Sequence, residues 1–408
     1  MKKLNFGVVG YGCRGSSLTK NILLNMEDVA VATVCDTYAD RTEKAMNDVE
    51  AKSGRRPFGT TDYTVLLAQG GLDAVLVSAA WEMHVEIATE ALKRGIPVAL
   101  EVGGAYSIDS LWEMVRTQER TGTPLMMMEN CCFGRQELLA TSLVRHGLLG
   151  EIVHCHGCYG HFLGDEIAGG IKNRHYRLRN YLRRNCDNYP THELGPIAKV
   201  LNINRGNQML SLVSVASRSA GMAEYLRAHA EEYPELAGME FRQGDIVNTL
   251  ITCADGATIS LRLDTTLPRS YAREFTVRGT RGMYEQNCNM VYLAGEPETF
   301  NTQRFYRENM GNAEKYEKDY LPPVWSRMTP EQIRAGHGGI DSIEFRAFAD
   351  ALRAGAEMPI DVYDAAAWMS ISALSAASIA AGGAPQAVPD FTGGRWVMRE
   401  PRDVTEIG

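Results

Sequence analysis

Near its N-terminus the chain reads LNFGVVGYGCRG, residues 4–15, in which an apolar run leads directly into three closely spaced glycines. Gly10, Gly12 and Gly15 would let the backbone turn off a strand, approach a pyrophosphate and pack closely against the next helix. A second apolar run, Val29 to Cys35, follows and ends in an aspartate. Strand, glycine turn, helix, strand and acid occur in the order that predicts a dinucleotide-binding Rossmann domain.

That aspartate, Asp36, indicates which dinucleotide is bound. It lies 36 − 15 = 21 positions after Gly15, where an acid is expected to bind the adenosine ribose. A carboxylate about 4 Å from a 2′-phosphate would meet a repulsion of ~4 kcal/mol near a protein surface. The sequence therefore favours NAD over NADP. Arg41 is the feature that suits NADP, because a nearby arginine can accommodate the additional phosphate.

The composition limits the classes of partner. The 408 residues are 45% hydrophobic, which is enough for two ordinary cores, and their net charge of −8 gives no support to nucleic-acid binding. Nine scattered cysteines are typical of reduced, buried thiols, and no apolar run reaches membrane-spanning length. We therefore expect a cytoplasmic protein that binds neither nucleic acid nor membrane.

Apolar runs alternate with helical segments as far as residue 130. This alternation predicts an α/β first domain over residues 1–130, a doubly wound parallel sheet with helical crossovers. Ligands of such sheets lie beyond the carboxyl ends of the strands. The residues expected at those ends, around the nicotinamide, are Trp81, His84, Glu101, Val102 and Asn130.

A second, α+β domain is expected over residues 131–408, built on an open and largely antiparallel sheet. Two pairs of strand-like runs predict hairpins, one around Asp255-Gly256 and one around residues 279–282. The polar stretch from Gly295 to Ser326 is predicted to be irregular. An open sheet has a face to cover, so we expect a homo-oligomer that pairs through it.

The C-terminal part is predicted to be helical and to pack back on the first domain. Thr329-Pro330-Glu331-Gln332 matches a capping box with proline at the first helical position. Longer helices are predicted at residues 340–354 and 362–381. Between them and the capping box, Gly336 to Asp341 is either a structural turn or a loop that brings His337 and backbone amides to a ligand.

His192 is the strongest candidate for chemistry in the second half. It follows a proline-containing bend and precedes an apolar helix start, where an imidazole can face a cleft. Tyr189 and Arg177 lie in the same arginine-rich stretch, residues 177–196, which is more typical of a helix face or an anion clamp than of a nucleic-acid arm. A base near neutrality is what alcohol oxidation by NAD requires, so His192 is predicted to take the hydroxyl proton.

The stretch from His154 to Cys158, with His161 beyond it, resembles a zinc ligand set by composition alone. Side chains alternate faces along a strand, so Cys155 and Cys158 would point in opposite directions and could not share one metal ion. The prediction is buried cysteines, half-exposed histidines and no metal.

The chain resembles the Gfo/Idh/MocA family of oxidoreductases over nearly its whole length, through the glycine turn, Glu101-Val102 and the region of His192. Ordinary dehydrogenases of that family carry Glu-Lys-Pro at the Glu101 position and an Asp-x-Gly-x-His-x-x-Asp pattern around the histidine. This chain has Val102 in place of the lysine, and its histidine motif, residues 188–195, lacks both acids and the glycine between them.

These departures resemble one branch, glycoside hydrolase family 109, whose members are NAD-dependent glycosidases first known as α-N-acetylgalactosaminidases. Several separate stretches carry the resemblance, and they read YPTHELGP (189–196), NINRG (202–206), HGG (337–339), DVYDAA (361–366) and VPDFT (388–392). Glu193, where the family often has glycine, is a departure beside His192.

The resemblance implies roles for individual residues. The catalytic residues that it implies are His192, Tyr189 and Tyr271. The substrate positions are Arg177, Tyr189, His192 and Tyr271. The cofactor positions are Cys13, Arg14, Asp36, Trp81, His84, Glu101, Val102, Asn130 and Tyr189, in addition to Gly10 and Gly12.

The resemblance also implies a reaction, the redox-neutral hydrolysis of a small-molecule glycoside, either an N-acetylgalactosaminide or another hexoside. A transient ketone at C3 acidifies the hydrogen at C2, so that the C1 substituent leaves, water adds and the hydride returns. A plain NAD-dependent sugar or polyol dehydrogenase fits the first domain equally well, but Val102 counts against it. A non-catalytic sugar or nucleotide sensor would only bind through the same side chains.

Overall fold

The computed structural model describes residues 2–295 and 302–407, which form two compact units. The first unit contains residues 1–133 and 327–366, and the second contains residues 134–326 and 367–408. The sequence placed the domain boundary after residue 130 and expected the C-terminal helices to pack back on the first domain; residues 327–366 cluster with the first unit.

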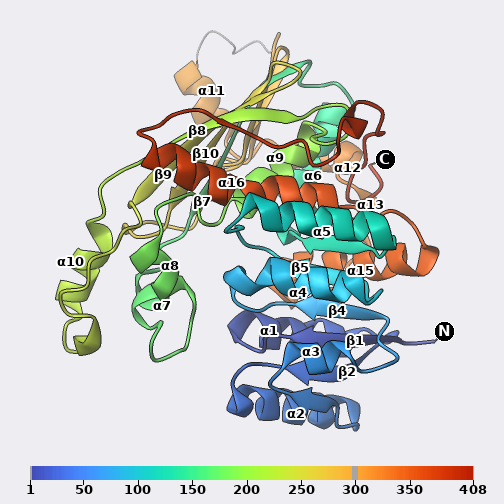
Figure 1. Ribbon diagram of the computed structural model, residues 1–408. Helices are drawn as coiled ribbons and strands as arrows, with labels where there is room; N and C mark the ends of the chain where they lie inside the picture. The colour runs from blue at the N-terminus through green and yellow to red at the C-terminus, as the bar shows by residue number, and fades with distance from the viewer. Residues whose placement is uncertain (1, 296–301, 408) are drawn as a thin grey trace. The chain divides into compact units, whose positions relative to one another are not determined.

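The first unit is built on a six-stranded parallel sheet with the order β3-β2-β1-β4-β5-β6 (Figure 1). Its central strands carry near-continuous apolar runs because helices cover both faces of such a sheet. The predicted doubly wound sheet is confirmed. The strands are β1 Leu4–Val9, β2 Val29–Cys35, β3 Phe58–Thr60, β4 Ala74–Val77, β5 Val98–Glu101 and β6 Leu125–Met128.

Helices connect these strands, and a C-terminal segment completes the first unit. The connecting helices are α1 Cys13–Asn21, α2 Ala39–Ser53, α3 Tyr63–Leu67, α4 Trp81–Lys93 and α5 Ile108–Thr121. In the C-terminal segment, α14 (Pro330–Arg334) begins with the predicted capping box at Thr329, and α15 (Ile340–Ala354) follows. Arg346 and Arg353 of α15 both pair with Asp28, which fixes this helix against the N-terminal strands.

The second unit is built on an eight-stranded mixed sheet with the order β13-β12-β11-β7-β10-β9-β8-β14 (Figure 1). Only the pair β7 and β10 is parallel, and both predicted hairpins, β9 with β10 and β11 with β12, are antiparallel as expected. The strands are β7 Ile152–Gly160, β8 Met209–Ala216, β9 Ile246–Cys253, β10 Thr258–Asp264, β11 Thr276–Gly279, β12 Gly282–Glu285, β13 Met290–Leu293 and β14 Gln386–Ala387.

Helices of the second unit cover one face of this sheet. Along β9, Val247, Thr249, Ile251 and Cys253 are buried while the residues between them are exposed or half-exposed, so the other face stays open. Helix α9 (Thr191–Val200) contacts β7 and β10 on the covered side. The remaining helices of this unit include α6 Arg135–Arg145, α7 Gly164–Ala168, α8 Arg177–Arg183 and α10 Gly221–Ala228, and α16 Val362–Ala380 enters it from the first unit.

The stretch from Gly295 to Ser326, predicted to be irregular, is largely helical where the structure describes it. It forms α11 (Thr302–Asn309), α12 (Glu314–Tyr320) and α13 (Pro323–Ser326), while residues 296–301 lie outside the described residues. The irregular prediction was therefore wrong for most of this stretch. Polar helices of one or two turns leave no apolar periodicity, which is the signal that the prediction relied on.

The cysteines are all free thiols, and seven of the nine are buried, as predicted. Across residues 2–295 and 302–407, none of the helices combines the length and the apolar character needed to cross a bilayer.

Candidate functional site

The glycine turn of the first unit requires glycine for steric reasons. Gly10 has a φ of 95°, and a Cβ added there would lie 2.5 Å from the Ser78 carbonyl oxygen. A Cβ on Gly15 would lie 2.0 Å from the carbonyl oxygen of Gly10. Gly12 precedes α1, and no side chain caps the amides of that helix. The uncapped helix terminus fits the pyrophosphate of a dinucleotide.

Asp36 is fixed at the carboxyl end of β2 and faces this turn. Its Oδ2 accepts a hydrogen bond from the Tyr11 amide at 2.8 Å, and its Oδ1 accepts one from the Tyr38 amide at 3.0 Å. Arg41 approaches to 4.0 Å and packs over the Tyr38 ring. The buried carboxylate fits the ribose hydroxyl contact that the sequence predicts, with Arg41 beside it.

The other cofactor residues predicted from the sequence follow the carboxyl ends of strands in the first unit. Trp81 begins α4, and Glu101 ends β5 with the buried Val102 behind it. His84 is buried, which lowers its pKa to about 4, and its Nε2 hydrogen-bonds to the Ala79 carbonyl at 2.9 Å. This imidazole is therefore neutral and structural near pH 7.

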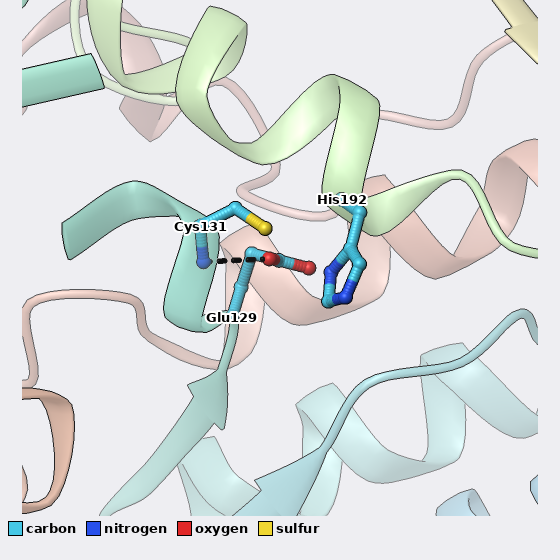
Figure 2. Close-up of side chains that lie close together, drawn as sticks. All are labelled: Glu129, Cys131 and His192. Carbon is cyan, nitrogen blue, oxygen red and sulfur yellow. Dashed lines mark hydrogen bonds between the residues drawn. The ribbon is translucent and has the colours of Figure 1, made fainter. Parts of the chain in front are cut away.

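The segment after β6 is ordered by side chain to backbone hydrogen bonds. Glu129 accepts a hydrogen bond from the Cys131 amide at 3.1 Å (Figure 2). Asn130 between them is buried and donates to Asp341 at 2.7 Å, a contact that no sequence pattern had indicated. Cys13, the first residue of α1, is exposed.

The second unit brings His192 and Tyr189 together. His192 lies in the first turn of α9 (Figure 2), and its Nε2 is 3.4 Å from the Tyr189 hydroxyl. Tyr159 at the end of β7 completes the group, with its ring centroid 4.6 Å from that of Tyr189 and 5.6 Å from that of His192. Sequence reasoning missed Tyr159, because only the pairing of distant segments reveals it.

Tyr271 joins the same group through a second histidine. The Tyr159 hydroxyl is 3.2 Å from Nδ1 of His161, whose ring packs edge-on against Tyr271 at 5.2 Å between centroids. Burial and the nearby Arg177 charge lower the pKa of His161, so this imidazole is neutral near pH 7. Tyr271 is the exposed member of the group, with 55% of its surface accessible. These imidazoles and phenols therefore form one continuous series of contacts, from the buried Tyr159 and Tyr189 to the exposed Tyr271.

Arg177 supports this group from α8. Its guanidinium lies over the Tyr189 ring at 5.1 Å, and it forms an ion pair with Glu166 of α7. Burial acts to lower the pKa of Arg177, but the neighbouring Tyr159 and Glu166 outweigh it and hold that pKa above its ordinary value. A buried cation of this kind can orient hydroxyl groups, while its charge is already balanced by Glu166.

A pair of buried acids, Asp187 and Glu193, lies beneath the aromatic group. Glu193 accepts hydrogen bonds from the backbone amides of Tyr159 at 3.0 Å and of Arg262 at 3.1 Å. Asp187 is buried beside Glu193, and its Oδ2 accepts a hydrogen bond from the Thr249 hydroxyl at 3.5 Å. Burial and the Asp187 charge hold the pKa of Glu193 well above its ordinary value. Glu193 therefore holds the backbone at the end of β7, where Tyr159 lies.

The histidines and the cysteines of β7 lie in different surroundings: the histidines contact hydroxyl groups of the next strand, and the cysteines are buried. His154 and His156 contact Thr258 and Ser260 of the neighbouring strand. Burial raises the pKa of the Cys155 thiol and brings that of Cys158 to about 11. Among the described residues, no three ligand atoms of these histidines and cysteines lie close enough together to hold one metal ion.

Comparison with known proteins identifies the family. Residues 4–129 match the profile of the oxidoreductase family NAD-binding Rossmann fold (Gfo/Idh/MocA), and residues 133–398 match that of the glycosyl hydrolase 109 C-terminal domain. The chain belongs to glycosyl hydrolase family 109. This family 109 chain therefore carries an NAD-binding domain, and its relatives are glycosidases.

Its similarity to family relatives extends over the full chain. It is 35% identical over 421 residues to an alpha-N-acetylgalactosaminidase from Tannerella forsythia, covering 98% of this chain and 88% of that protein. A glycosyl hydrolase family 109 protein from Stenotrophomonas maltophilia is 34% identical over 426 residues, with 98% and 91% covered.

Solved structures share the fold of this family 109 chain. Levoglucosan dehydrogenase in complex with NADH and L-sorbose superposes with a TM-score of 0.72 at 16% identity, covering 96% of this chain and 100% of that chain. An oxidoreductase from Agrobacterium radiobacter in complex with NAD+, L-tartaric acid and magnesium gives 0.66 at 17% identity, with 96% and 99% covered.

Proposed function

We propose that this chain hydrolyses glycosides, N-acetylgalactosaminides among them, by a redox-neutral route. The name of the relative from Tannerella forsythia supports this substrate class. Bound NAD would supply a reversible hydride acceptor for the sugar C3 carbon, so that a C3 ketone forms and is later reduced. The uncapped α1 terminus and Asp36 fit that cofactor.

Residues of the second unit would move the protons. His192 takes the proton of the C3 hydroxyl, and Tyr189 or Tyr271 removes the hydrogen at C2 that the ketone has acidified. The C1 substituent leaves with a proton, water adds hydroxyl to C1 and hydrogen to C2, and His192 returns its proton to the C3 oxygen. The products are the free sugar and the released alcohol.

One observation supports this route over ordinary glycoside hydrolysis. Two carboxyl groups facing the scissile bond are the usual requirement, whereas the acids of the second unit that lie near His192 are already engaged. Glu193 is buried and binds backbone amides, Asp187 is buried beside it, and Glu166 is paired with Arg177. Within the second unit, the groups around His192 that remain for proton transfer are imidazoles and phenols.

The test uses chromogenic α- and β-N-acetylgalactosaminides with the NAD-loaded protein in deuterated water. We expect aglycone release without net NADH, and deuterium at C2 of the product. Accumulation of NADH would favour a dehydrogenase. The absence of both aglycone release and NADH would favour a non-catalytic sensor. Full activity after NAD is stripped from the protein would refute the proposal.

A substitution at His192 tests its role as the base. His192→Asn is expected to lower kcat by about 10²–10⁴, the usual contribution of a general base, while the NAD content stays at the level of the unsubstituted protein. His154→Asn is the matched control, because that histidine contacts Thr258 rather than the tyrosine group. Equal kcat values for the two variants would remove His192 from the mechanism.

A further inference from the structure

Arg14, two positions after Gly12, has a guanidinium that is fully engaged by the protein. Its Nε and Nη2 contact Glu101 at 3.1 and 3.0 Å. Its Nη1 and Nη2 donate to Asp341 at 2.8 and 3.1 Å, and its Nη1 also lies 3.1 Å from Nδ1 of His337. With all three nitrogens occupied, this side chain is a bridge within the first unit rather than a spare cation for a phosphate.

Asp341 is the second centre of this network. Besides Arg14, its carboxylate accepts a hydrogen bond from Asn130 at 2.7 Å and lies 2.9 Å from Nδ1 of His337. Burial acts to raise the pKa of Asp341, but the contacts with His337 and Arg14 outweigh it and hold that pKa well below its ordinary value. One buried carboxylate thus ties the glycine turn, the segment after β6 and the start of α15 together.

The turn before α15 holds an unusual backbone conformation. His337, Gly338 and Gly339 have φ values of 48°, 70° and 97°. A left-handed residue other than glycine costs about 1–3 kcal/mol and persists only where its surroundings enforce it. The hydrogen bond that His337 Nδ1 donates to Asp341, whose carboxylate Arg14 also holds, is the contact that enforces it here.

A third acid, Glu344, lies close to this network. Glu344, one helical turn after Asp341, is fully buried, and burial together with the charges of Glu101 and Asp341 holds its pKa well above its ordinary value. The carboxylates that contact the Arg14 guanidinium are those of Glu101 and Asp341. Removing the Asp341 charge would leave the bridge with one carboxylate instead of two.

We propose that Arg14, Asp341 and His337 form a clasp that ties residues 337–341 to the glycine turn and thereby slows the release of NAD. Its benefit rests on the proposed function, because an enzyme that returns its hydride in every turnover has no need to exchange the cofactor. A dehydrogenase that releases NADH would gain nothing from it.

The test measures cofactor retention without any glycoside. Unsubstituted protein, Asp341→Asn and His337→Ala are loaded with NAD and passed into NAD-free buffer, and the nucleotide still bound is measured over time. Loss of one charge-assisted hydrogen bond is expected to speed NAD loss by about tenfold or more in Asp341→Asn, and His337→Ala is expected to change in the same direction. Arg346→Met is the matched control, because it removes an α15 ion pair with Asp28 that lies outside the clasp.

Circular dichroism and thermal melting establish that each variant is folded. A folded Asp341→Asn protein that loses NAD at the unsubstituted rate would overturn the clasp. If Asp341→Asn does not fold, the test rests on His337→Ala, which changes a more exposed side chain. An unchanged rate of NAD loss in His337→Ala would then overturn the clasp. Slow NAD release by a protein that cleaves no glycoside would refute the proposed function and leave the clasp intact.

Discussion

Glu193 is a buried acid that holds the backbone next to His192. Its carboxyl group and that of Asp187 are buried, and Glu193 accepts hydrogen bonds from the backbone amides of Tyr159 and Arg262. Burial and the nearby Asp187 charge both disfavour the ionised form of Glu193, which is why its pKa is raised. Glu193 therefore fixes the backbone of Tyr159 beside His192.

The raised pKa of Glu193 predicts a pH dependence of stability. Because the pKa of Glu193 is raised on folding, its stabilisation is complete below the unfolded value of about 4.3 and is lost as the pH rises through the folded value. Glu193→Gln keeps a donor and an acceptor without titrating. Its free energy of unfolding relative to the unsubstituted protein should rise by up to about 1.4 kcal/mol per pH unit, measured by urea denaturation.

A second acid provides the control for that measurement. The hydrogen bond from Arg346, together with the charge of Arg353, lowers the pKa of Asp28. Its stabilisation is lost only as the pH falls, so Asp28→Asn should show a constant difference between about pH 5 and 8. Parallel pH profiles for the two variants would contradict the raised pKa of Glu193.

Which residues of the candidate site could be predicted depended on how far their signals extend along the chain. Asp36 and the glycines belong to one short motif, and His192 and Tyr189 belong to one bend, so local spacing was sufficient to nominate them as candidates. Tyr159, Glu166 and Asp341 reach their partners through long-range pairing, and nothing in their own neighbourhoods distinguishes them. Their roles follow only from the three-dimensional positions of β7, α7 and α15.

The glycine turn between β1 and α1 gives a prediction at the level of one structural element. Gly15→Ala would place a Cβ 2.0 Å from the Gly10 carbonyl oxygen, so the turn must open, at an expected cost of about 1–3 kcal/mol in unfolding free energy. NAD binding, measured by calorimetry, should weaken with it. Gly70→Ala is the control, because nothing lies within 4 Å of a Cβ at that position. Unchanged NAD affinity in Gly15→Ala would show that the turn tolerates a side chain.

Elements differed in how well the sequence predicted them, for physical reasons. The parallel strands β4, β5 and β6 and the helix α15 have strong apolar patterns because each buries a whole face or both faces. Strand β3 has three residues and the helices α11 to α13 have four to eight, too few for a period to show. The parallel pairing of β7 with β10 depends on crossover topology and leaves no local pattern.

The open face of the second sheet remains the proposed surface for pairing of two chains. Leu250 is 59% exposed there, and Val213 and Val215 of β8 lie opposite Leu250 and Asn248 in the antiparallel register. An isologous interface would bring the same apolar strip from both copies together, so one substitution acts twice. Leu250→Arg should therefore convert an oligomer into a monomer.

Sedimentation velocity at several protein concentrations measures that conversion. Since Leu250 is exposed, its replacement should change the unfolding free energy of the single chain by no more than about 0.5 kcal/mol, which separates loss of pairing from loss of folding. Val65→Arg, at an exposed apolar position of the first unit, controls for added charge and should leave the assembly unchanged. An unsubstituted protein that sediments as a monomer throughout, or an oligomer that survives Leu250→Arg, would show that this face is not the pairing surface.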